Sequence, residues 1–378
     1  MKIVITRVGD CLIADGLNLF IYELSDALLR LGHEVYLMSG TAEYVDVQGK
    51  EWAFRNAIKE MFSVKEVPSL ASLSYHGLHT WRTPFLSLIE ENLLFAYKGS
   101  RIISQISPDM VVFNGVTTML CPCFKVAVCT DMQFRVKTLM YYDSLMYRTS
   151  DKIVAVSTEL KHGLTRQFRL PAEKIPVIPV CIDVSKFRAR ASNNRIHAIL
   201  HVGTRPEKGP DTTVDAFEII ARNDPELELL IAGGLDPRAG PLLSRIRQKD
   251  EKIQKRISFL GNLSKEELVE VYSKVKVTCV PSDYTVPVCS PTVIESLASG
   301  TPVVGSLSAI SEDILIEGYT GFRVKPGDIA MYASRLKRII TNDELRSEMS
   351  RNAVNVAQRF DKMKVARDYL SLYKSYSD

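Results

Sequence analysis

The sequence predicts an α/β protein of two doubly wound, Rossmann-like domains that face a cleft. Three observations predict it. The chain has 378 residues, which is too many for one ordinary hydrophobic core and enough for two domains. Short apolar runs alternate with helical patterns in both halves, as they do where helices cover a parallel sheet. A proline-rich stretch, residues 170–190, separates the two alternating halves.

The first half opens with an apolar strand at residues 2–6, followed by a helix whose apolar positions from Leu17 to Leu31 recur at close to 3.6 residues. Gly32 ends that helix, and a second strand begins at residue 33. Later apolar runs predict strands buried on both faces, at residues 110–113, 125–129 and 152–157. Two further stretches, 51–64 and 81–103, have helical patterns. The loop between them holds His76 and His79, which we interpret as surface residues that could also line an acceptor site.

The second half repeats the alternation from Ile196 onward. Strands are expected at residues 197–202, 227–232, 257–260, 277–280 and 302–304. Helices are expected at 212–222, at 264–274 and after Ser290, and a turn at 317–328. The predicted domains are residues 1–185 and 186–355, with a last helical segment at 356–378.

The composition and the motifs that are absent exclude several classes of function. The chain is 46% hydrophobic and 24% charged, with a net charge of +4, far from the strongly basic balance of a nucleic-acid-binding protein. Its start lacks the pattern of a signal peptide, and no apolar run approaches the roughly 20 residues that span a bilayer. We therefore expect a cytoplasmic protein. The absence of G-x-G-x-x-G after any strand, and of a P-loop, disfavours an NAD(P) enzyme and a P-loop ATPase.

The seven cysteines are scattered, mostly in apolar runs, and we interpret them as buried free thiols in a reducing compartment. Cys121-Pro-Cys123 with Cys129 is their only cluster. It lacks a paired C-x-x-C and a nearby histidine, so no metal site is expected there.

The segment from residue 281 to 302 carries the clearest chemical pattern. Ser290 is a good N-cap, Pro291 suits the first helical position, and Gly300 ends the helix before a buried strand. A helix that starts at the carboxyl end of a strand offers amides to an anion, and the hydroxyls of Ser290 and Thr292 would add to them. Glu295, about one turn into the helix, is either a ribose-binding carboxylate or an ordinary glutamate favoured by the helix dipole.

A second segment, residues 201–211, lies between a strand and a helix. It places Arg205 and Lys208 on a loop that contains Gly203. Cations on such a loop bind phosphate groups, although a solvated charged turn is the plainer interpretation of this segment alone.

In their order along the chain, these segments resemble the retaining, nucleotide-sugar-dependent glycosyltransferases of the GT-B fold, known as family 4 or group 1. VGTRPEKGPDTTVDAF is similar to the family's donor loop and helix, and IESLASGTPVV and EGYTGFRVKPGD to its later donor-domain stretches. LGHEV, SPDMVV, KIVAVSTEL and VIPVCIDVSKF are similar to landmarks of the first half. The tail RFDKMKVARDYLSLY resembles the family's C-terminal helix, which crosses back onto the N-terminal domain.

The resemblance implies a role for each matching residue. Glu295, the second Glu of the family's Glu-x7-Glu motif, would bind the donor ribose. Lys208 and Arg205 would neutralise the departing diphosphate. Gly16 would lie in the N-terminal loop that approaches the donor. The remaining donor-binding candidates come from the loop and the helix start: Gly203, Ser290, Thr292 and Val293. The resemblance also implies retention of configuration, no metal and no cofactor beyond the nucleotide-sugar substrate.

This sequence departs from the family pattern at several positions. The first Glu of the motif falls on Pro287, with Asp283 as the nearest acid. The catalytic-region histidine is replaced by Thr130, followed by Asp131, which become catalytic candidates in its place. Thr204 follows Gly203, so that Arg205 is displaced by one residue. These changes concern the sugar and the acceptor more than the nucleotide.

The predicted function is a hexosyltransferase that moves a sugar from a UDP- or GDP-sugar to a glycan, lipid-linked or small-molecule acceptor. One alternative is a catalytically silent nucleotide-sugar-binding subunit, and another is a different GT-B enzyme such as an epimerase or phosphorylase. Peripheral contact with the inner membrane face is a weaker hypothesis. It rests on the mixed aromatic and basic residues of 51–64 and on Trp81, Arg82 and Phe85.

Overall fold

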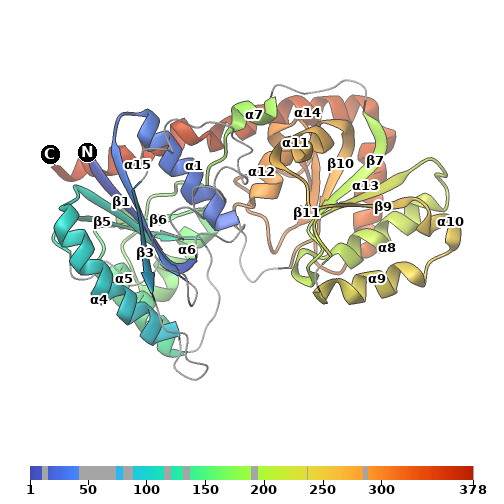
Figure 1. The fold of residues 1–378 in the computed structure, drawn as a ribbon. Helices are drawn as coiled ribbons and strands as arrows, with labels where there is room; N and C mark the ends of the chain where they lie inside the picture. Colours follow the sequence, from blue (N-terminus) through green and yellow to red (C-terminus); the bar gives the residue numbers. More distant parts are fainter. Residues whose placement is uncertain are drawn as a thin grey trace. The chain divides into compact units, whose positions relative to one another are not determined.

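The computed structural model describes residues 1–10, 16–41, 74–79, 88–114, 121–130, 137–188, 195–235, 237–283 and 288–377. It divides the chain into two compact units. The first unit contains residues 1–181 and 362–378, and the second contains residues 182–361 (Figure 1). The two predicted parallel-sheet α/β domains are confirmed.

The first unit is built on a six-stranded parallel sheet with the order β3-β2-β1-β4-β5-β6. Its strands are β1 (Lys2–Asp10), β2 (Glu34–Thr41), β3 (Ser74–His79), β4 (Met110–Asn114), β5 (Phe124–Cys129) and β6 (Lys152–Ala155). Its helices are α1 (Gly16–Arg30), α4 (Leu88–Ile106), α5 (Lys137–Thr149), α6 (Thr158–Phe168), the short 3-10 helix η1 (Ala172–Lys174) and α15 (Lys362–Ser377).

Strand β3 corrects one expectation. His76 and His79 were predicted in a loop, but both lie on this edge strand, which pairs with β2 from Ser74 opposite Tyr36 to His79 opposite Thr41. The segment SYHGLH has neither the β-branched residues nor the clean alternation that identify a strand, so its pairing with β2 decides its structure. The predicted helix at 51–64 lies outside the described residues, as do Trp81, Arg82 and Phe85. Of the predicted helix at 81–103, residues 88–103 are observed within α4, and residues 81–87 lie outside the described residues.

The second unit has a parallel sheet with the order β12-β11-β10-β7-β8-β9. Its strands are β7 (Ile196–Val202), β8 (Glu228–Ala232), β9 (Ile257–Gly261), β10 (Val275–Val280), β11 (Val303–Ser306) and β12 (Gly321–Val324). Its helices are α7 (Val184–Arg188), α8 (Pro210–Ala221), α9 (Gly240–Arg247), α10 (Glu251–Gln254), α11 (Lys265–Lys274), α12 (Pro291–Ala298), α13 (Ile329–Thr341) and α14 (Asp343–Ala357), with the 3-10 turns η2 (Pro206–Lys208), η3 (Pro237–Ala239) and η4 (Gln358–Phe360).

Strand β12 corrects a second expectation, since residues 317–328 were predicted as a turn. Four residues that begin with glycine give a weak strand pattern. Gly321 nevertheless pairs with Val303 of β11, and a Cβ on Gly321 would lie 1.8 Å from the Val303 carbonyl oxygen. Gly321 is therefore the residue that lets the edge strand approach β11.

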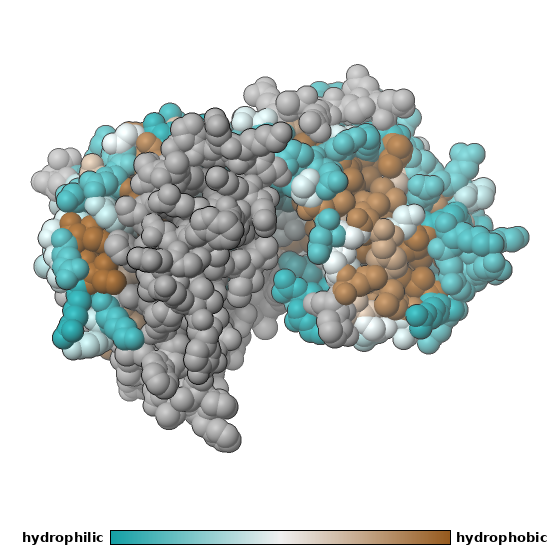
Figure 2. Space-filling view, viewed as in Figure 1, coloured by the Kyte–Doolittle hydropathy of each residue, from teal (hydrophilic) through white to brown (hydrophobic). Residues whose placement is uncertain are grey.

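The core of the second unit lies between its sheet and the helices α8 and α13. Phe217 on α8 and Tyr332 and Leu336 on α13 have no exposed surface, and they pack against strand residues such as Ile199. Burying a side chain of this size contributes roughly 1.5 to 3 kcal/mol. Figure 2 shows hydrophobic residues on the visible face of this unit with hydrophilic residues around them.

Helix α15 returns to the first unit and lies alongside α1 (Figure 1). The Nζ atom of Lys362 lies 2.9 Å from Glu23 and 2.7 Å from Asp26, and all three side chains are buried. Further along α15, the ring of Tyr369 packs against Phe20 with centroids 6.4 Å apart. Burial makes these ion pairs sensitive to the loss of either partner, because a carboxylate without its cation is costly away from water.

We expect Lys362→Met to lower the free energy of unfolding by about 3 kcal/mol, because it removes the buried cation beside Glu23 and Asp26, of which Asp26 keeps its ion pair with Arg30. Lys364→Met is the matched control, two residues further along the same helix. Its exposed ammonium lies 3.2 Å from Asp368, and we expect a loss of no more than about 0.5 kcal/mol. Urea unfolding followed by circular dichroism measures both. Equal losses in the two variants would contradict the role of Lys362.

Candidate functional site

The second sheet reverses its direction of growth between β7 and β10. From β7 the strand order runs to β8 and β9 on one side, and to β10, β11 and β12 on the other. Parallel α/β sheets bind ligands at such a switch point, outside the carboxyl ends of the strands. The loops that follow β7 and β10 are the two segments that the sequence singled out, residues 203–209 and 281–290.

These two loops touch through their backbones. Gly209 has a φ of +70°, and a Cβ built on it would lie 2.6 Å from the carbonyl oxygen of Pro281. The backbone N–H of Asp283 donates to the carbonyl oxygen of Glu207 at 3.3 Å. A side chain at position 209 would force the loops apart, so glycine is required both for the conformation and for the contact.

The cations of the first loop differ in their surroundings. The side chain of Lys208 lies across Gly203, where a Cβ would come within 2.9 Å of the lysine Cγ. Arg205 is exposed, and its guanidinium lies 3.7 Å from Glu207. The loop thus carries one cation packed on its backbone and one that extends into solvent.

The loop is also held in place by His201, a residue that the sequence analysis missed. This side chain is buried at the end of β7. Its Nε2 atom donates to the Gly203 carbonyl oxygen at 2.8 Å, and its Nδ1 atom accepts from the Thr213 hydroxyl at 2.8 Å. Burial, assisted by the charge of Lys208, lowers the pKa of His201 to about 4. The ring is therefore neutral at neutral pH and acts as a bridge between the loop and α8. The available signal was a histidine within an apolar run, next to the loop.

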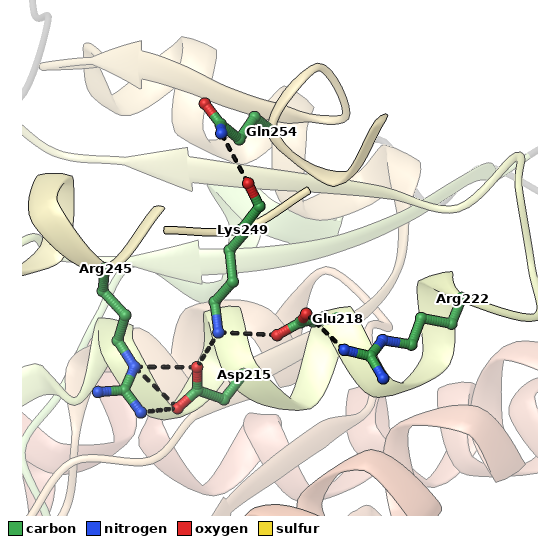
Figure 3. A network of polar contacts seen from close by, with 6 residues as sticks. All are labelled: Asp215, Glu218, Arg222, Arg245, Lys249 and Gln254. Carbon is green, nitrogen blue, oxygen red and sulfur yellow. Dashed lines mark hydrogen bonds and ion pairs between the residues drawn. The ribbon is translucent and has the colours of Figure 1, made fainter. Parts of the chain in front are cut away.

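Helix α8, which follows the loop, is fixed to its neighbours by a network of charges (Figure 3). Asp215 accepts from Arg245 at 2.9 Å and from Lys249 at 2.7 Å. Lys249 also contacts Glu218 at 2.7 Å, which in turn pairs with Arg222. Burial raises the pKa of Asp215, but the hydrogen bonds from the two cations outweigh it and lower that pKa overall.

The second loop leads into α12 as predicted, with Ser290 at the N-cap position and Pro291 as the first helical residue. The Ser290 hydroxyl makes no capping hydrogen bond among the described residues. The amides of Val293 and Ile294 both donate to the Ser290 carbonyl oxygen at 3.1 Å. The side chain of Val293 is in the core. We expected free amides at this helix start, but the amide of Val293 is already hydrogen-bonded within the helix.

Glu295 is buried within the unit, with 4% of its surface exposed. One carboxylate oxygen forms an ion pair with Lys265, and the other accepts from the Tyr272 hydroxyl at 3.3 Å. Burial and the charge of Glu295 raise the pKa of Tyr272, so its hydroxyl stays protonated and donates. Thr292, one turn before Glu295, also contacts that hydroxyl. Sequence reasoning identified Glu295 and Thr292 but neither of the other two residues.

Two of the remaining candidates belong to the first unit. Gly16 begins α1 and Thr130 directly follows β5, both in the first unit. Asp131 and Pro287 lie outside the described residues. Asp283 is exposed and accepts from the Ser308 hydroxyl at 3.2 Å.

Six cysteines lie among the described residues, and all are free thiols. The Sγ atoms of Cys121 and Cys123 are 2.7 Å apart, and the hydrogen bond between them lowers the pKa of Cys121 to about 7. No group of three or more His, Cys, Asp or Glu side chains suited to a metal ion occurs in the described ranges. In the same ranges, no helix combines the length and the apolar character needed to cross a membrane.

Two families match the sequence in succession. Residues 14–186 match Glycosyltransferase Family 4, and residues 186–356 match Glycosyl transferases group 1. The chain belongs to the group 1/family 4 glycosyltransferases.

Known proteins resemble this glycosyltransferase in sequence and in fold. D-inositol 3-phosphate glycosyltransferase of Corynebacterium efficiens is 31% identical over 238 residues, which cover 58% of this chain and 56% of that protein. The chain thus spans about half the length of this curated relative. A glycosyltransferase structure from Rickettsia africae matches with a TM-score of 0.76 at 19% identity, over 99% of this chain and 98% of the other. Anabaena Alr3699/HepE in complex with UDP-glucose matches with a TM-score of 0.75 at 16% identity, over 99% and 100%. The glycosyltransferase has the GT-B fold.

The low pKa of His201 predicts an acid-dependent loss of stability for this glycosyltransferase. The unfolded chain takes up a proton below about pH 6.5, whereas the native ring stays neutral down to about pH 4. Stability should therefore fall as the pH falls between these values, by roughly 3 kcal/mol in all, and this component should disappear in His201→Leu. Urea unfolding at pH 7, 6, 5 and 4 measures it.

Thr213→Val serves as the control for this experiment. It removes the hydroxyl partner but keeps the histidine, so it should be less stable at every pH and retain the acid-dependent component. The interpretation is wrong if His201→Leu loses as much stability between pH 7 and pH 4 as the wild type does.

Proposed function

We propose that this glycosyltransferase moves a sugar from a nucleoside-diphosphate sugar to an acceptor, with retention of anomeric configuration and without a bound metal ion. The observation that carries the proposal is the contact between the loops after β7 and β10. It puts Lys208 and the start of α12 at one sheet edge, the switch point of the second unit.

The diphosphate is the leaving group of this reaction. As the bond from the anomeric carbon to the diphosphate breaks, negative charge increases on the phosphate oxygens. Lys208 and Arg205 supply positive charge on one loop, and the Ser290 hydroxyl supplies a hydrogen-bond donor at the helix start. Gly203 leaves room for the Lys208 side chain beside the backbone.

Glu295 binds the donor ribose in this proposal. A carboxylate accepts hydrogen bonds from two neighbouring hydroxyls, and a ribose presents two. The contacts with Tyr272 and Lys265 hold the Glu295 carboxylate in place. UDP is the favoured nucleotide, because the HepE structure of the same fold holds UDP-glucose. GDP is the second candidate.

The acceptor class is a glycan, a lipid-linked sugar or a small molecule. The curated relative from Corynebacterium efficiens is named for a small phosphorylated acceptor, which favours the last of these. Gly16, Thr130 and Asp131 stay predictions for the acceptor side and the N-terminal loop. Cytoplasmic location and peripheral membrane contact also stay predictions.

A silent nucleotide-sugar-binding subunit is the second candidate function. It is favoured by Pro287 and Thr130, where the family resemblance leads us to expect an acid and a histidine. The two functions share the donor site and differ in turnover.

We expect the purified chain to transfer or hydrolyse sugar from at least one UDP-, GDP- or ADP-sugar, and Glu295→Ala to abolish this activity. Glu295→Gln keeps the shape of the side chain and tests the charge. Glu312→Gln, at an exposed glutamate of the same unit, should keep full activity. Release of nucleoside diphosphate is the readout, and circular dichroism checks folding.

The outcomes separate the two functions. Binding of a nucleoside diphosphate without turnover on a broad acceptor panel would favour the silent subunit. If UDP, GDP and ADP at about 100 times the expected Kd all fail to raise the Tm, the donor site itself is wrong, because ligand binding at that concentration stabilises by about 2.7 kcal/mol.

Lys208→Ala should lower kcat by about 10²- to 10³-fold, because it removes a cation that stabilises the charge on the leaving group. Lys255→Ala is the control, since Lys255 is an exposed lysine of α10's C-terminal end that pairs only with Glu251 among the described residues. Steady-state kinetics with the best donor compare the two. A kcat for Lys208→Ala within twofold of the control would contradict the assignment.

A further inference from the structure

Lys265, the first residue of α11, is buried against the proposed ribose carboxylate. Only 8% of its side chain is exposed, and its ammonium forms an ion pair with Glu295. The ammonium also lies 4.9 Å from the centroid of the Phe187 ring, which covers one side of it. Lysine is almost never buried to this extent without a partner, and here the partner is the carboxylate to which a function has been assigned.

Stability alone is a weak reason for this pair. Two charges that leave water lose hydration, and a well-packed apolar pair of similar volume often stabilises a fold as well or better. Helix α11 is already fixed at its start by a capping box, in which the Ser264 hydroxyl accepts from the Glu267 amide and the Glu267 carboxylate accepts from the Ser264 amide. The pair of Lys265 and Glu295 therefore calls for a ligand-related explanation.

The hydrogen-bonding capacity of the pair is incompletely used. An ammonium has three N–H donors, and among the described residues Lys265 has Glu295 as its one hydrogen-bond partner. A carboxylate has about four acceptor sites, of which Lys265 and Tyr272 take two. The ammonium of Lys265 thus has unused hydrogen-bond donors next to unused acceptor sites on the Glu295 carboxylate.

A ribose hydroxyl matches this arrangement, because it donates one hydrogen bond and accepts others. We propose that Lys265 is a specificity-determining residue of the nucleoside subsite: its ammonium donates to a ribose hydroxyl oxygen while that hydroxyl, or its neighbour, donates to Glu295. This inference rests on the proposed function of Glu295. It adds that the site recognises the ribose through a charge-balanced pair and that a deoxyribose leaves buried donors and acceptors unmatched.

The test compares each nucleoside diphosphate with its deoxy form. For UDP, GDP and ADP, calorimetric titration gives the Kd of the ribose form and of the 2′-deoxy and 3′-deoxy forms. The quantity of interest is the ratio of the deoxy Kd to the ribose Kd. We expect this ratio to fall about tenfold in Lys265→Met for at least one deoxy position, which corresponds to the loss of one charge-assisted hydrogen bond.

Lys274→Met is the control on the same helix. Its ammonium is half-exposed and pairs with Glu270, so the ratio should stay at the wild-type value. Lys265→Arg keeps the charge and the donors and should retain most of the preference for ribose. Since Lys265→Met leaves a buried carboxylate unpaired, the comparison of Lys265→Met/Glu295→Gln with Glu295→Gln gives the same information in a neutral site if the single variant does not fold.

A purely structural role for Lys265 predicts a different result. The variants would then lose stability and weaken all ligands equally, and unchanged ratios at both deoxy positions would overturn the inference while leaving the donor site intact. If the wild type binds none of the three nucleoside diphosphates, the proposed function and the inference fall together.

Discussion

The close contact between the loops after β7 and β10 is the constraint on which the candidate site depends. The Gly209 backbone sits against the Pro281 carbonyl group at a distance that excludes a side chain. Because both strands belong to one parallel sheet, the contact fixes the height of the two loops above the same sheet edge. The contact joins the loop that carries Lys208 to the loop that leads into α12, two segments that are far apart in sequence.

Two buried lysines form similar ion pairs but differ in role, one in each unit. Lys362 joins α15 to two carboxylates of α1, where no candidate ligand group is close in the described structure, and its role is to hold the returning helix. Lys265 pairs with a carboxylate at the carboxyl edge of the second sheet. The cost of desolvation is similar for both lysines. The two lysines therefore differ in their position relative to the sheet edge, not in the strength of their ion pairs. On this basis we assign Lys362 to holding α15 and propose Lys265 for ligand recognition.

The sequence predicted most of the fold because each half contains clear apolar runs, which indicate strands, and apolar residues at a helical spacing, which indicate helices. It missed β3 and β12, short edge strands whose histidine and glycine residues are poor strand formers, since pairing with a neighbouring strand decides their structure. In the site it found residues within recognisable segments, such as Glu295 and Lys208. It missed Lys265 because that residue meets Glu295 only through the packing of α11 on α12, thirty residues apart. No local pattern reports such a contact.

The histidine of the 201–211 loop segment, His201, adds no positive charge to the loop at neutral pH. Burial and the charge of Lys208 both lower the pKa of His201, so Lys208 and Arg205 are the loop's cations at neutral pH, with Glu207 beside the arginine. A third cation, buried beneath the loop, would have to leave water at a large cost. As a neutral ring, His201 instead donates to the Gly203 carbonyl oxygen and fixes the backbone at that residue. The same residue thus holds the backbone across which Lys208 lies, which is why its hydrogen bonds matter more than its charge.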